Sequence, residues 1–505
     1  MAVPRHRTPS LRRAVAAAVA AAALLACSGD DDPAGPATTA PAEGSTTTTS
    51  TTEPAPTVPA VTVRGPVPGE PQTSGASGLA EAGYVEEEFF VSGSARSFDP
   101  DGELGDDGDW ALVVRDEAPY TTRILVKRPA DPADASGVVV VEWNNVSAGA
   151  DGTPDWTYTA AELLRAGHVH VAVSAQAGGV DDADAGGILG GPGRPLTAAD
   201  PERYGELVHP GDDHSYDLFA QVGALVSSVP GDGTPDPLAG LPRDHVIAIG
   251  ESQSAFRLTA FVNGVHPLAP VFDGFLVHSR GGGAAPFDAS TTDGLTSAIT
   301  GEVRIREDVD VPVLVFSTET DLTVLGYAPA RQPDSDHVRS WDVAGTAHAD
   351  AFLLGGDPVA AGEALGCGQP VNDGPQHLAL KAALAHLVEW VVAGTEPPAG
   401  TPIEVGDDGA IVRDADGNAV GGVRLPAVEV PAATLSGDAA GGGVLCGLFG
   451  STTAFSPADL ATRYGDRGTY LRRYEDALDR AIADGLVLEA DRAAALAEAE
   501  DVDFG

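Results

Sequence analysis

The feature that most constrains the fold is an alternation of short apolar runs with amphipathic helical stretches. The runs are nearly continuous in apolar character and rich in β-branched residues, which is typical of strands buried on both faces. Helical patterns at 155–166 and 215–229 lie between them. The alternation predicts a doubly wound, mostly parallel α/β sheet. The predicted strands are 120–128, 138–143, 168–173, 245–249, 271–278, 311–317 and 338–343.

Further elements flank this core at both ends. Residues 84–99 resemble one arm of a hairpin before the sheet, and 376–393 form an amphipathic helical pattern after it. The tail at 460–501 predicts two more helices that pack on the body. No repeat or second boundary interrupts the chain, so we expect one domain over 80–505.

The N-terminus predicts export. Residues 1–26 combine four arginines with an apolar stretch of signal-peptide length, too short to span a bilayer comfortably. The stretch ends in Leu24-Leu25-Ala26-Cys27, which resembles a bacterial lipobox. Cleavage there would leave Cys27 as an acylated N-terminal residue. Several acyl chains on one residue hold a protein firmly to a membrane. We expect a lipid-anchored protein of the bacterial cell envelope, outside the cytoplasm; the alternative is plain secretion.

The segment that follows is low in complexity. Residues 27–60 are mostly Ser, Thr, Pro, Ala, Gly and Asp, and are predicted to be a disordered tether. The whole chain carries a formal net charge of −45. Such a charge repels nucleic acid and anionic lipid headgroups, so a nucleic-acid partner is excluded and the membrane is expected to be reached only through the anchor.

The pentapeptide Gly250-Glu251-Ser252-Gln253-Ser254 lies between a predicted buried strand and a predicted helix. A serine on such a tight turn has the context of a nucleophile elbow. The amide that follows it, that of Gln253, lies at a helix N-terminus, where a developing oxyanion is stabilised. The alternative is a serine that merely caps the helix.

A serine nucleophile needs a base and an acid that orients the base, here in the order serine, acid, histidine. Asp321 follows the predicted strand 311–317 at the usual offset, and Glu319 is the alternative acid two residues earlier. His348 lies on a small-residue loop directly after the last predicted strand. We expect His348 to act as the general base.

The second oxyanion donor is expected from the loop after an early strand. The run 138–141 leads into such a loop, and a backbone N–H near Asn144 or Asn145 is the candidate. The residues leave open which of the two it is.

The spacing of the cysteines and the context of the glycine runs indicate neither a metal site nor a cofactor site. The chain has three cysteines, and if Cys27 is acylated, Cys367 and Cys446 are the remaining pair. We expect these two to form a disulfide in an oxidising compartment. No metal-ligand spacing accompanies either one, and the glycine runs at 281–283 and 441–443 lack the strand–loop–helix context of a phosphate loop.

Taken together, these segments resemble the α/β-hydrolase superfamily, within it the poorly characterised bacterial group labelled alpha/beta hydrolase domain proteins, with a Gly-Glu-Ser-Gln-Ser elbow. The resemblance runs from residue 80 to the C-terminus. It implies a serine hydrolase with Ser252 as nucleophile and His348 as base, and it adds no cofactor. The segments that carry it are 120–126, 140–146, 203–205, 209–211, 215–217, 250–255, 319–321, 344–350, 367, 370–375 and 421–426.

These observations predict a membrane-tethered, extracytoplasmic serine hydrolase of small or lipid-like carboxylic esters that acts through an acyl-enzyme. A lactonase, amidase or acyltransferase could use the same residues. A non-catalytic envelope lipoprotein on a hydrolase scaffold is the alternative from another class.

Overall fold

The computed structural model describes residues 58–73, 78–182, 193–231, 233–288, 301–439, 441 and 443–505. The predicted signal peptide 1–26, Cys27 and nearly all of the tether 27–60 lie outside these ranges. Among the helices that are described, none combines the length and apolar character needed to cross a membrane.

A nine-stranded sheet forms the centre of the molecule, in the order β1-β2-β3-β5-β4-β6-β7-β8-β9. The strands from β5 to β9 are mutually parallel, whereas β1, β2 and β3 join them by antiparallel pairing. This is the doubly wound, mostly parallel sheet that the sequence predicts. The bounds are β1 Thr62–Arg64, β2 Tyr84–Pro100, β3 Leu112–Pro129, β4 Val138–Trp143, β5 Val169–Val173, β6 His245–Glu251, β7 Gly274–His278, β8 Val313–Thr318 and β9 Val338–Val343.

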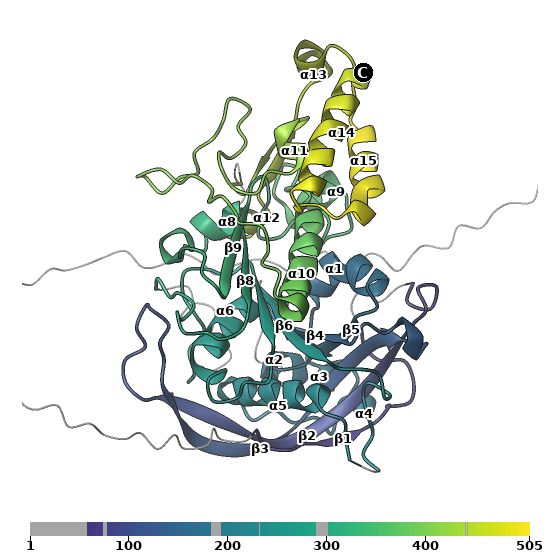
Figure 1. Cartoon of the computed structure of the whole chain (residues 1–505), viewed down its shortest axis with the longest axis vertical. Coiled ribbons are helices and arrows are strands. Elements are labelled where there is room, and N and C mark those ends of the chain that lie inside the picture. The colour runs from purple at the N-terminus through teal and green to yellow at the C-terminus, as the bar shows by residue number, and fades with distance from the viewer. Residues whose placement is uncertain are drawn as a thin grey trace, which may run out of the picture.

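The predicted hairpin arm is one side of a long ribbon. β2 pairs with β3 along its length, from Tyr84 opposite Pro129 to Pro100 opposite Leu112. The ribbon curves along the lower edge of the molecule in Figure 1. Its β3 arm extends the predicted strand 120–128 in both directions, because the pairing with β2 stabilises polar residues that carry no strand signal of their own.

Helices cover both faces of the sheet. They are needed there because successive side chains of a strand point to opposite faces, and both sets are apolar. Val139 and Val141 of β4 pack into the core that holds α5 and α6. Val138 and Val140 pack on the other side, in the core that holds α1 and α10. The helices of this body are α1 Pro154–Arg165, α2 Ala177–Val180, α3 Leu196–Ala199, α4 Pro201–Tyr204, α5 Ser215–Ser227, α6 Gln253–Ala260, α8 Glu319–Thr323, α9 Pro358–Leu365 and α10 Gln376–Ala393.

The C-terminal part adds a small layer beside the carboxyl end of the sheet. It contains the short helices α11 and α12 and the two-stranded ribbon of β10 and β11. Three helices, α13, α14 and α15, follow where the sequence predicts two, and they stack at the top of Figure 1. A separate apolar cluster that includes Leu460, Tyr470 and Tyr474 holds these helices together. The bounds are α11 Pro426–Glu429, β10 Ala433–Ser436, α12 Gly443–Phe449, β11 Ser451–Ala454, α13 Pro457–Tyr464, α14 Arg467–Ala483 and α15 Arg492–Glu500.

Candidate active site

Ser252 lies on the turn between β6 and α6. Its φ of 58° and ψ of −118° form a backbone conformation that L-residues rarely adopt. The Ser252 amide donates to the backbone oxygen of His278 at 3.0 Å, which ties the turn to the neighbouring strand β7. The strained turn therefore lies at the carboxyl edge of the sheet, at the strand–turn–helix junction that the sequence predicts.

Small residues let the helix pack closely on the strand at this turn. A Cβ atom at Gly250 would lie 2.9 Å from Cβ of Ser254 and 3.1 Å from Cδ1 of Leu258. Glycine is therefore required at position 250. Ser254 is itself completely buried, so a larger residue there would push α6 away from the sheet.

His348 lies on the loop after β9 and reaches the serine. Its Nε2 is 2.8 Å from Oγ of Ser252. Helix α12 holds this loop in place, because the Ala349 amide donates to the backbone oxygen of Leu448 in α12 at 3.0 Å. The two side chains are nearly buried, with Ser252 9% and His348 5% exposed.

Asp321 supplies the carboxylate on the other side of the histidine. Its Oδ1 is 2.7 Å from Nδ1 of His348. Its Oδ2 accepts hydrogen bonds from the amide and the hydroxyl of Thr318, at 2.7 and 2.8 Å. Thr318 and Asp321 are the two ends of a capping box that begins α8. The helix start thus fixes one oxygen of the acid and leaves the other for the histidine.

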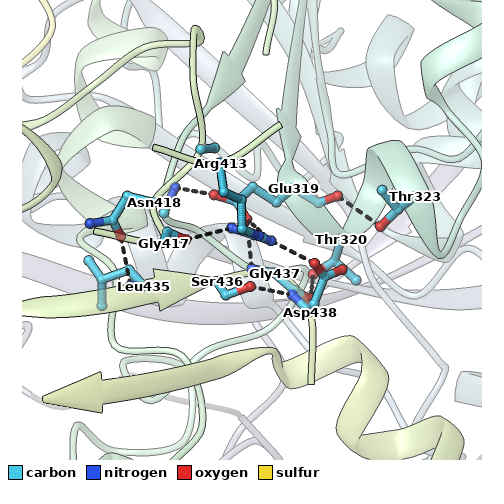
Figure 2. Close-up of polar contacts among 12 residues, drawn as sticks. Glu319, Thr320, Thr323, Arg413, Gly417, Asn418, Leu435, Ser436, Gly437 and Asp438 are labelled. Atoms are coloured by element: carbon cyan, nitrogen blue, oxygen red, sulfur yellow. Dashed lines mark hydrogen bonds and ion pairs between the residues drawn. The ribbon is translucent and has the colours of Figure 1, made fainter. Parts of the chain in front are cut away.

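Glu319 has a different place, although it is only two residues away. Its carboxylate accepts from the amides of Gly345 at 2.7 Å and Gly437 at 3.0 Å. It also accepts from the guanidinium of Arg413 at 3.0 Å (Figure 2). Glu319 therefore joins the β9 loop to the C-terminal layer and does not contact His348.

The electrostatic surroundings favour a charged His348. Burial alone would lower the pKa of this imidazole, but the hydrogen bond to Asp321 and the negative charges of Asp321 and Glu251 together raise the pKa above its ordinary value. A base with a raised pKa takes a proton from a hydroxyl more readily.

The amides around the turn differ in availability. The Gln253 amide, at the start of α6, donates to no acceptor within the described ranges. The Asn144 and Asn145 amides are already engaged, with the backbone oxygens of Val173 at 3.1 Å and Gly152 at 2.9 Å. The next amide along the loop, that of Val146, donates to Oε1 of Gln253 at 3.2 Å.

Glu251 is a further side chain at the turn, and the sequence pattern by itself gives it no role. Its Oε1 is 3.6 Å from Nε2 of His348. Its Oε2 and its backbone oxygen both accept from Nδ2 of Asn145, each at 3.1 Å. An ionisable residue inside the elbow pentapeptide is the signal that could have drawn attention to it.

The predicted disulfide is present. Cys367 and Cys446 are bonded, across 79 residues of sequence. Cys446 lies in α12, the helix that supports the His348 loop, so the bond fastens that support to the segment after α9. Among the described side chains, no group of three or more His, Cys, Asp or Glu residues is placed to hold a metal ion.

Fold and side chains define an α/β protein in which a serine, a histidine and an aspartate are hydrogen-bonded in series at the carboxyl edge of a parallel sheet. The chain belongs to the family described as alpha/beta hydrolase domain, whose model matches residues 43–497. This membership confirms the resemblance and the fold class that the sequence predicts, and it makes the chain an α/β-hydrolase.

Several solved structures are similar to this chain at low sequence identity. An α/β serine hydrolase homologue from Coxiella burnetii is 11% identical, with 45% of this chain and 84% of that chain covered and a TM-score of 0.28. An α/β serine hydrolase without a lid from Xanthomonas campestris is 14% identical, with coverages of 54% and 93% and a TM-score of 0.27. A glucuronoyl esterase from Solibacter usitatus is 13% identical, with coverages of 56% and 84% and a TM-score of 0.28. A comparison with curated proteins gives no match.

Proposed function

We propose that the protein is a serine hydrolase of carboxylic esters. Ser252 is the nucleophile, His348 the general base and Asp321 the acid that orients it. The observation that carries the proposal is the unbroken series from Oγ of Ser252 through the imidazole to the carboxylate, with contacts of 2.8 and 2.7 Å.

The reaction follows from these contacts. Oγ of Ser252 attacks the ester carbonyl while Nε2 of His348 takes its proton, and Nε2 then passes the proton to the departing alkoxide. Asp321 holds Nδ1 protonated and stabilises the imidazolium. Water repeats the sequence on the acyl-enzyme and releases the acid.

The oxyanion requires two N–H donors. The Gln253 amide is the first, since it is unengaged at the start of α6. We assign the second to Val146 in place of Asn144 or Asn145, because both of those amides bond within the fold. The Val146 amide now donates its hydrogen bond to the side-chain oxygen of Gln253, and a substrate oxygen would replace that acceptor.

We also propose that this enzyme lies outside the cytoplasm, held to a membrane through acylated Cys27 with residues 27–60 as the tether. The support for this location is the arginine-rich, apolar segment before Cys27. Cys27→Ser is expected to move the protein from the membrane fraction to the soluble fraction of cells. An unchanged membrane fraction would contradict the anchor and leave the hydrolase proposal intact.

A panel of p-nitrophenyl esters of graded acyl length, with the matching p-nitroanilides, tests the reaction class. Ester turnover that exceeds anilide turnover and disappears in Ser252→Ala is the expected result. Equal ester turnover by wild type and Ser252→Ala would overturn the proposal. Faster turnover of the anilides would change the assigned reaction class from esterase to amidase, with the same side chains in the same roles.

A further inference from the structure

The second carboxylate at the turn belongs to Glu251, the residue before the nucleophile. As the last residue of β6, it is paired in register with His278 of β7. Its carboxylate lies 3.6 Å from Nε2 of His348, the nitrogen that contacts the Ser252 hydroxyl. His348 therefore has a carboxylate on each side, Asp321 at Nδ1 and Glu251 at Nε2.

Asn145 holds the Glu251 carboxylate in this place. One amide group, Nδ2 of Asn145, donates both to Oε2 and to the backbone oxygen of Glu251, at 3.1 Å each. Oε1 is left toward the histidine. The residue is 5% exposed, so water screens its charge weakly.

The geometry points to a function for Glu251: it is a positioning residue that acts through His348, stabilising the imidazolium that forms when Ser252 gives up its proton. This inference rests on the proposed serine hydrolase mechanism and adds a residue to it. Glu251 takes no proton from the substrate or from Ser252. The proton moves from Oγ to Nε2 and on to the leaving oxygen, while the charge of Glu251 favours the intermediate state in which Nε2 carries it.

The ionisation of Glu251 makes this contribution depend on pH. Burial raises the pKa of the Glu251 carboxyl to about 7, against the opposing effect of the positive charges that His348 and His278 can carry. Below that pH the carboxyl is neutral and its attraction for the imidazolium is lost; above it the attraction is present. The titratable groups that face Glu251 from neighbouring elements are His348 on the β9 loop, His278 in β7, Asp155 and Tyr158 in α1, and Asp321 in α8.

Two substitutions separate charge from shape. Glu251→Gln removes the charge but keeps the length and an oxygen for Asn145, whereas Glu251→Asp keeps the charge but shortens the side chain. Each is compared with wild type in the pH dependence of kcat/KM for p-nitrophenyl acetate, with thermal unfolding as the check on folding.

We expect Glu251→Gln to lower the maximal kcat/KM roughly tenfold, because a less stabilised imidazolium means a weaker base. The acid limb of its pH profile, where kcat/KM falls as the pH is lowered, should move to lower pH by about one unit. The reason is that loss of the negative charge lowers the pKa of His348. Glu251→Asp should move the limb less than half as far. An acid limb and rate equal to wild type in Glu251→Gln, or a rate loss without any shift of the limb, would overturn the inference.

Ser252→Ala in the same series keeps this test separate from that of the proposed function. If the mechanism is right and the inference about Glu251 is wrong, Ser252→Ala is inactive while Glu251→Gln behaves as wild type. If Ser252→Ala retains full turnover, the serine mechanism itself fails, and the inference fails with it.

Discussion

Two of the buried histidine–carboxylate pairs in the described part of the chain have the same length but behave differently. At the carboxyl edge of the sheet, His348 meets Asp321 at 2.7 Å. Between β4 and β5, Nε2 of His170 meets Oε2 of Glu142, also at 2.7 Å. The pKa of His348 is raised, whereas burial and the nearby charge of Lys127 drive the pKa of His170 well below its ordinary value.

The surroundings explain the difference. Glu142 accepts the amides of Asp155 and Trp156 at the start of α1, each at 3.1 Å, and burial raises its own pKa well above the ordinary value. The second nitrogen of His170, Nδ1, has no hydrogen-bond partner among the described residues. A histidine–carboxylate pair is thus one way to place polar groups in the interior. The His348 pair differs from the His170 pair because a hydroxyl on a strained turn lies at its second nitrogen.

The largest expected effect separates the two acids of α8, Asp321 and Glu319. Asp321→Asn should lower kcat by about 10³- to 10⁴-fold, because the amide no longer holds the imidazole in the required tautomer. Glu319→Gln, the matched control, should keep kcat within about tenfold and lower the free energy of unfolding instead, since its carboxylate holds Gly437 and Arg413. A greater loss of kcat in Glu319→Gln would reverse the assignment of the acid.

The next largest effect is expected at the Val146 amide, which belongs to the Ser252 region and has no counterpart in the proposed chemistry around His170. Val146→Pro removes the N–H assigned to the oxyanion, so kcat should fall by about 10²-fold. Val146→Ala keeps that N–H and should retain kcat within about threefold of wild type, the scale of lost side-chain packing alone. Equal kcat values in the two variants would show that the Val146 amide is not the second oxyanion donor.

The pH dependence of kcat/KM should follow the groups around Ser252 and not the buried pair of His170 and Glu142. Only the neutral imidazole accepts a proton, so activity is lost as pH falls through the raised pKa of His348 and is recovered as pH rises. The loss should approach tenfold per unit below that pKa. An acid limb well below the ordinary histidine value, near 6.5, would contradict the raised pKa.

The smallest effect on activity is expected at the buried pair. Glu142→Gln should leave kcat/KM and its acid limb near those of wild type, because the pair does not contact Ser252. It should lower the free energy of unfolding by about 1–3 kcal/mol, since an amide nitrogen would face a backbone N–H. Urea unfolding with parallel kinetics measures both. A shifted acid limb in this variant would show that the two pairs are coupled.

Local patterns indicated the strands of the parallel sheet and the chain order of Ser252, Asp321 and His348, which the structure brings into hydrogen-bonding contact. The apolar runs mark the parallel strands because strands buried on both faces need continuous apolar character. The choice between Asp321 and Glu319 could also have been sharpened, because Thr318 three residues before Asp321 forms a capping box that aims the acid.

The remaining features depend on contacts between distant segments. The amides of Asn144 and Asn145 are engaged by Val173 and Gly152, which no local pattern indicates. The link from Glu319 to Arg413 spans 94 residues of sequence. The approach of Glu251 to His348 depends on how β6 and the β9 loop meet in space, so the sequence could only mark it as an acid inside the elbow.

Reaction with a fluorophosphonate probe, with the adduct mapped to a residue by mass spectrometry, tests most directly whether Ser252 is an activated nucleophile. We predict a single adduct on Ser252, absent from Ser252→Ala and formed far more slowly in His348→Ala. No adduct on the folded wild-type protein, or the same labelling in wild type and Ser252→Ala, would contradict the account.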